Sequence, residues 1–180
     1  MRRNMIIGLS NEEIENLVDE LDNWAATMKK AGANIANDLA EYGHKKMQEI
    51  YQEAQQQYQD MSSMDFTITG SETEKTISMI GEQALYDEFG TGTRGAENPH
   101  PAKSEFGLND YNSGPTIRAA KTEINGIKPG DLYWTYKDEA GEVHFTQGIP
   151  AQKEGYDSLK AMKQKAPEII RKRMEETLKW

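Results

Sequence analysis

An apolar stripe running from Ile14 to Tyr58, at spacings of three and four residues, constrains the fold more than any other feature. Residues so spaced lie on one face of an α-helix, so the stripe predicts one long helix, or two with a break near Gly32. Its members are Ile14, Leu17, Val18, Leu21, Trp24, Ala25, Met28, Ala31, Ile35, Leu39, Tyr42, Lys46 or Met47, Ile50, Ala54 and Tyr58. Because such a helix is stabilised by packing its apolar face, we interpret the stripe as core or subunit interface.

The start of this helix is marked by a capping box at Ser10 to Glu13. The Ser10 hydroxyl is placed to accept from the Glu13 amide, and the Glu13 carboxylate can reach back to the Ser10 amide. The predicted helical region therefore covers residues 10–58.

Two β-hairpins are predicted in the middle of the chain. Phe66 to Thr69 and Lys75 to Ile80 alternate in polarity around a turn at 70–73, and Leu132 to Tyr136 and Val143 to Thr146 flank a turn with Gly141. Together they predict one antiparallel sheet of at least four strands within residues 65–151.

A turn-rich segment at 90–131 separates the hairpins. Before it, residues 81–89 favour a short helix, in which Tyr86 and Phe89 would share a buried face and Gly90 would end the helix. A segment of this length is functional or disordered in most proteins, and Thr116 to Glu123 is compatible with a helical turn inside it.

The last element is an amphipathic helix at 152–180, interrupted or kinked at Pro167, which lacks an amide donor. The chain is thus predicted to be α+β and a single domain over residues 1–180. Its parts are a long N-terminal amphipathic helix, an antiparallel sheet of two hairpins, a long inserted loop at 90–131 and a C-terminal amphipathic helix.

Composition narrows the function classes. The 180 residues carry a net charge of −9, which disfavours binding to a phosphate backbone, and contain no cysteine, which excludes thiolate chemistry. The N-terminus has no sustained apolar run typical of a signal or membrane segment. Only 36% of the residues are hydrophobic, so we expect burial to be completed between subunits or part of the chain to project into solvent. Residues 153–180 are net basic and could meet the acidic body of a neighbouring copy.

A catalytic or metal-binding constellation is not evident from local spacing. His44, His100 and His144 form no helical pair, and Gly90 to Gly95 lacks the lysine of a phosphate-binding loop. Most carboxylates fall on predicted helix surfaces, where a solvated face is expected. A small metal-dependent hydrolase, using His100, Asp110 and His144 brought together by folding, remains an alternative. Otherwise no cofactor or metal is expected.

Four segments resemble the gene-10-product-like family of long-tailed bacteriophages and prophages. They are Tyr86 with Glu88-Phe89-Gly90-Thr91-Gly92, then Asn98-Pro99-His100-Pro101, then Tyr133-Trp134-Thr135-Tyr136, and finally Thr146-Gln147-Gly148-Ile149-Pro150-Ala151. The order of the predicted elements is similar to that family as well. The resemblance implies that structural turn and interface residues are Tyr86, Glu88, Phe89, Gly90, Thr91, Gly92, Pro99, His100, Pro101, Trp134, Gly148 and Pro150.

The resemblance also implies a role. Members are neck or tail-component proteins, so this chain is expected to be a virion structural protein of the head–tail junction rather than an enzyme. It would be assembled in the host bacterial cytoplasm as a homo-oligomeric ring that contacts head-closure, tail-terminator or tail-tube proteins. No membrane and no sequence-specific nucleic acid is expected, although DNA would pass through the ring. A phage-encoded module that binds a host protein is a further alternative.

Overall fold

The structure, a computed structural model, describes residues 10–57, 63–81, 83–106, 118–137 and 140–178. In chain order its elements are α1 (Asn11–Gln57), β1 (Asp65–Gly70), β2 (Lys75–Ile80), α2 (Ala84–Phe89), α3 (Gly92–Glu97), β3 (Arg118–Ala119), β4 (Leu132–Lys137), β5 (Val143–Thr146) and α4 (Glu154–Leu178). The α+β class, the long first helix and the C-terminal helix are as predicted.

Helix α1 is one uninterrupted helix of 47 residues, about 70 Å long at the usual rise per residue. The capping box is present, because the Ser10 amide donates to Glu13 Oε2 at 2.7 Å and the Glu13 amide donates to Ser10 Oγ at 3.2 Å. The prediction left open one helix or two, and a single helix is correct over Asn11–Gln57. Gly32 is exposed and does not break it.

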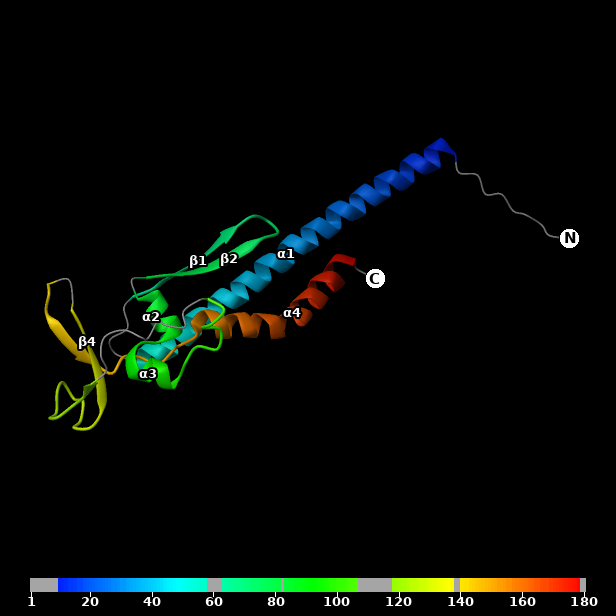
Figure 1. Cartoon of the computed structure of the whole chain (residues 1–180). Coiled ribbons are helices and arrows are strands. Elements are labelled where there is room, and N and C mark those ends of the chain that lie inside the picture. The colour runs from blue at the N-terminus through cyan, green and yellow to red at the C-terminus, as the bar shows by residue number, and fades with distance from the viewer. Residues whose placement is uncertain (1–9, 58–62, 82, 107–117, 138–139, 179–180) are drawn as a thin grey trace.

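The core lies along the C-terminal half of α1, between α4 on one side and the β1–β2 hairpin on the other (Figure 1). The three elements meet at Gly43, where an added Cβ would collide with Met162 Sδ and lie 2.7 Å from Ile77 Cδ1. The hairpin is fixed by His44 Nε2, which donates to the Phe66 carbonyl at 3.1 Å. Further along, the rings of Tyr51 and Phe66 contact each other at a tilt of 60°, with 5.4 Å between their centres.

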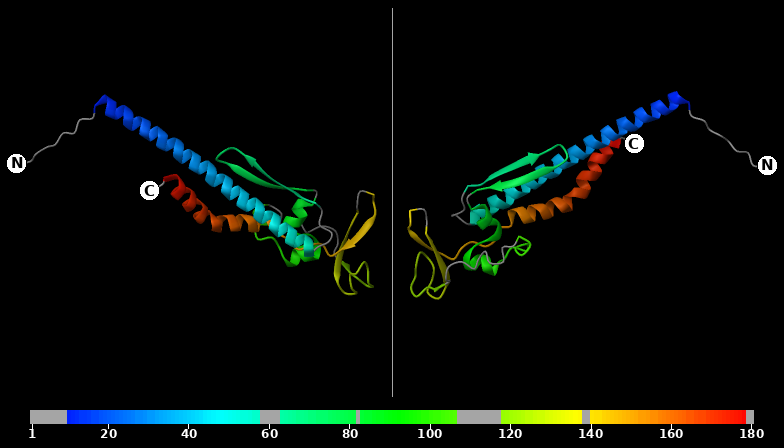
Figure 2. Two further views of the ribbon diagram at one scale, coloured as in Figure 1. Left: turned by 180° about the vertical axis from the view of Figure 1, so that it is seen from behind. Right: turned by 45° about the horizontal axis from the view of Figure 1, so that its top comes forward.

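Helix α4 is also fixed at its far end to α1. The Arg173 guanidinium donates to both oxygens of Asp38 at 2.6 and 2.7 Å, and to Glu176 at 2.9 Å. Pro167 lies inside α4 without interrupting it, and the helix changes direction along its length (Figure 2). A bend is expected because proline removes one backbone hydrogen bond and its ring displaces the preceding turn.

The two hairpins belong to different sheets, so the single sheet of at least four strands is wrong. Strands β1 and β2 form a two-stranded antiparallel sheet, whereas the second sheet has the order β3-β4-β5. The hairpins are separated because β1–β2 packs along α1, whereas β4 lies past the C-terminal end of α1 (Figure 1). The two strands of each hairpin pair with each other. The alternation of polar and apolar residues does not specify which other strands a hairpin joins.

The segment at 90–131 is more structured than predicted. Residues Gly92–Glu97 form α3 directly after the Gly90 turn. The helical turn expected at 116–123 is wrong for its described part, since Arg118–Ala119 pairs with Leu132 and Tyr133 as strand β3. Residues 116 and 117 lie outside the described part. Backbone pairing with β4 satisfies polar groups that a lone helical turn would leave exposed.

The N-terminal part of α1 extends beyond the rest of the fold (Figures 1 and 2). Residues 11–27 are all exposed, although the apolar stripe continues through them. Among the described residues, none of the helices has the length and apolar character needed to span a bilayer.

Candidate functional site

The Glu88 carboxylate caps the N-terminus of α4. Its Oε2 accepts a hydrogen bond from the Gly155 amide at 2.7 Å, and its Oε1 accepts one from the Tyr156 amide at 3.0 Å. The first amides of a helix have no partner within the helix and lie at the positive end of its dipole, so a carboxylate is the favoured cap. Glu88 is therefore a cap supplied by a segment distant in sequence, and α2 and α3 lie where α4 begins (Figure 1).

His100 completes this cap. Its Nε2 lies 2.9 Å from Glu88 Oε1, and its Nδ1 accepts from the Ala102 amide at 3.1 Å. Because Nδ1 accepts, the proton is on Nε2, which donates to the carboxylate. The ring is buried, 4.5 Å from Phe89 and 5.1 Å from Tyr156 between ring centres. Both ring nitrogens are thus used in structural contacts.

Residues 87–94 and residues 147–152 are hydrogen-bonded to each other, and we call this contact the junction. The Thr91 amide donates to the Ile149 carbonyl at 2.8 Å, and the Ile149 amide donates to Thr91 Oγ1 at 3.3 Å. Thr93 Oγ1 donates to the Gln147 carbonyl at 3.0 Å, and the Gln152 amide donates to the Asp87 carbonyl at 2.8 Å. The junction connects the second hairpin to α2, α3 and the start of α4.

The junction requires glycine at Gly90 and Gly148. Both have positive φ, 72° and 80°, in the region that other residues rarely adopt. An added Cβ at Gly90 would lie 2.5 Å from the Ala151 nitrogen, and one at Gly148 would collide with the Thr91 carbonyl oxygen. The predicted role of Gly90 in ending a helix is confirmed, since its amide donates to the Tyr86 carbonyl at 2.7 Å.

Other predicted residues lie in the junction or on the elements that it connects. Trp134 lies over Gly92, where an added Cβ would be 2.5 Å from the indole Nε1. The Pro150 carbonyl accepts from Gln152 Nε2 at 2.9 Å. Pro99 and Pro101 flank His100 in the segment after α3.

The expected shared face of Tyr86 and Phe89 is wrong. Phe89 is 5% exposed, whereas Tyr86 is 47% exposed. Helix α2 has only six residues, so the elements around it decide which of its sides is buried. That side carries Asp87 as well as Phe89. Phe89 packs on His100 and on Phe106, at 5.6 Å between ring centres.

Two carboxylates, Asp87 and Glu154, are completely buried beside the junction, and the sequence did not reveal either of them. Neither accepts a hydrogen bond from any part of the chain that the structure describes. Burial raises the pKa of Asp87 to about 6, and burial with the nearby charges of Glu88 and Asp87 raises the pKa of Glu154 to about 8. The expectation that carboxylates lie on solvated surfaces is wrong for both. In the sequence, the apolar neighbours of Asp87 were the only indication that one of these carboxylates is buried.

Of the three residues of the hydrolase alternative, the structure describes His100 and His144. His100 is held in the cap, His144 lies on β5 opposite Tyr136, and Asp110 is outside the described residues. Among the residues described, His, Asp and Glu side chains form no group of three that could hold a metal ion.

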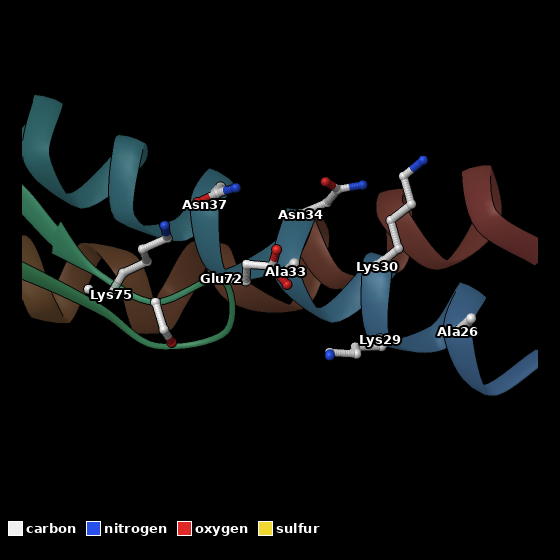
Figure 3. A pocket seen from close by; sticks show the side chains of 10 residues that line it. Ala26, Lys29, Lys30, Ala33, Asn34, Asn37, Glu72 and Lys75 are labelled. Atoms are coloured by element: carbon white, nitrogen blue, oxygen red, sulfur yellow. The ribbon is translucent and has the colours of Figure 1, made fainter.

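An open groove of about 630 Å³ lies between α1 and the turn of the first hairpin (Figure 3). Lys29, Lys30 and Lys75 point in different directions there, so they do not converge on one anion. The groove thus differs from an enclosed ligand site. Its lining residues are Ala26, Lys29, Lys30, Ala33, Asn34, Asn37, Gly70, Ser71, Glu72 and Lys75.

The site is therefore an architectural one, built from a carboxylate cap, a buried histidine and two interlocked backbone segments. In comparisons with protein-family models, with curated proteins and with solved structures, the chain matches none of them.

Proposed function

We propose that this chain is a structural protein of the phage neck, acting at the head–tail junction by assembling into a ring. The observation that carries the proposal is the junction. Two of the segments that resemble the gene-10-product-like family, Glu88–Gly92 and Thr146–Ala151, hydrogen-bond to each other through Thr91 and Ile149, and Glu88 caps the N-terminus of α4. A motif that holds parts of the fold together in this way fits a protein whose function is to form an assembly.

The shape of the molecule supports the same proposal. An apolar stripe on a helix that extends away from its own core is typical of a surface completed by another chain. The exposed part of that stripe includes Leu21 and Trp24, which are 65% and 58% exposed.

The charge distribution fits a conduit for DNA. With a net charge of −9, a ring of these chains that turns acidic residues toward its centre would hold no attractive well for DNA along the path. A bore lined with Lys and Arg in the assembled ring would contradict this part of the proposal.

Virion morphology tests the neck role. Deleting the gene from a phage or inducible prophage that encodes it should leave filled heads and separate tails by electron microscopy. A plasmid copy of the wild-type gene should restore joined particles. Normal infectious particles from the deletion would reject the neck role. Recovery of one stoichiometric host protein from uninfected cells would instead favour the host-binding alternative.

A further inference from the structure

The uncovered part of α1, residues 11–28, is here called the helix tip. It continues the stripe that packs against α4 and the first hairpin further along α1. Nothing in the described chain covers the tip, and five of its large apolar side chains are 46–65% exposed. They are Ile14, Leu17, Val18, Leu21 and Trp24.

The flanks of this stripe are acidic on both sides. On a helical projection Glu13 and Glu20 lie along one side, and Glu15 and Asp22 lie along the other. Residues 11–28 contain six acidic residues and no lysine or arginine. Pairing of two tips would place like charges against each other, whereas a basic-flanked stripe would be attracted.

The outer face of α4 has this complementary character. Leu159 and Ile170 are 48% and 43% exposed, and their separation of three helical turns puts them on one line with Lys163 between them. Lys160 and Arg171 lie beside that line. Residues 159–172 contain five basic residues and one acidic residue, Glu168, which is already paired with Lys165 at 2.6 Å.

The inner face of α4 is occupied by its own α1, whereas Leu159 and Ile170 on the outer face are exposed, so that face is open to a helix of another molecule. The lengths are compatible, at about 27 Å for the tip and about 20 Å for residues 159–172. We propose that the helix tip of one copy docks on the outer face of α4 of the next copy. Such a contact joins two different surfaces, so it repeats around a ring or along a filament.

This inference deepens the proposed function and rests on it for its biological setting. Cysteine cross-linking of the full chain tests it directly, because the wild-type chain contains no cysteine. A Val18→Cys chain and a Lys163→Cys chain are mixed and oxidised mildly. We expect a disulfide-linked heterodimer as the main product, and little product when Asn23→Cys, on the opposite face of the tip, replaces Val18→Cys. A main product linking Val18→Cys to itself, or no cross-link, would overturn the proposal.

Charge reversal gives a second readout. Glu15→Lys with Glu20→Lys should weaken self-association about tenfold in sedimentation equilibrium, and so should Lys160→Glu with Arg171→Glu. Mixing the two variants should restore association between them, whereas Asp19→Lys, away from the stripe, should change little. A wild-type chain that stays monomeric at the highest soluble concentration would also overturn the proposal.

The two proposals fail separately. A specific cross-link with a deletion phage that remains infectious would reject the neck role and leave the contact standing. Separate heads and tails without a cross-link would do the reverse.

Discussion

Glu88 and Gly155 are 67 positions apart in the chain, yet the Glu88 carboxylate accepts the Gly155 amide at 2.7 Å. An added Cβ at Gly155 would lie 3.3 Å from that same carboxylate oxygen, so the small residue allows the close approach. The α4 helix therefore begins where α2 ends, and its orientation depends on a side chain from another element. This cap links the junction to the interface between α1 and α4.

Replacing Glu88 should destabilise the protein strongly. Glu88→Ala removes the acceptor of three hydrogen bonds, from the Gly155 and Tyr156 amides and from His100, and leaves these donors buried. We expect a loss of about 2–4 kcal/mol in urea unfolding. Glu97→Ala, at an exposed position on α3, is the matched control and should change stability by less than about 0.5 kcal/mol. Equal effects of the two changes would contradict the capping role.

Gly148 and Gly141 separate the effect of backbone conformation from that of close contact. Their φ values are 80° and 82°, but an added Cβ meets nothing within 4 Å at Gly141 and collides with the Thr91 carbonyl oxygen at Gly148. Gly141→Ala should cost about 1–2 kcal/mol, the conformational cost alone. Gly148→Ala should cost more than about 3 kcal/mol, measured by thermal or urea unfolding. If the two variants were equally stable, the junction would not be tightly packed.

Stability should fall between about pH 4 and pH 8 because of Asp87 and Glu154. The folded state raises the pKa of Asp87 to about 6 and that of Glu154 to about 8, so it binds more protons than the unfolded state in this range. The contribution of the two neutral carboxyl groups to the stability of the protein is fully present below their pKa values in the unfolded state. It is lost as the pH rises through their pKa values in the folded state.

Variants make this pH dependence measurable. Glu154→Gln should flatten the decline and make the protein more stable at pH 8 relative to pH 5, by on the order of 1–3 kcal/mol compared with wild type. Glu97→Gln, at an exposed position on α3, should leave the decline unchanged. A wild-type stability that is flat from pH 5 to pH 8 would contradict the burial of charge at Glu154.

Arg173 should hold the far end of α4 to α1. Arg173→Ala and Asp38→Asn should each lower the urea midpoint slightly. The double variant should be no less stable than the less stable of the two single variants, since both changes remove the same ion pair. Lys121→Ala, at an exposed position outside α4, is the control for loss of a positive charge and should leave the midpoint unchanged. Additive losses from the two single changes would mean that the pair is not coupled. The hydrogen bond from Arg173 also holds the pKa of Asp38 below its usual range.

Features that depend on neighbours in sequence were predictable. The capping box at Ser10 and Glu13 and the helix end at Gly90 follow from local hydrogen bonding and from the freedom of glycine at positive φ. Of the functional residues, Glu88, Gly90 and Gly148 were singled out through the family resemblance. Their partners were not, because a cap between Glu88 and α4 leaves no periodic signal in either segment.

The sequence by itself determined the two long helices, the short helix α2 and the two hairpins, because periodicity and turn residues act over a few positions. Only the tertiary structure decided that the hairpins form separate sheets, that Asp87 and Glu154 are buried, and that half of the α1 stripe is covered while the tip is exposed. These outcomes depend on which surfaces meet across long stretches of chain. An apolar stripe has the same pattern whether its partner is α4 of the same copy or another molecule.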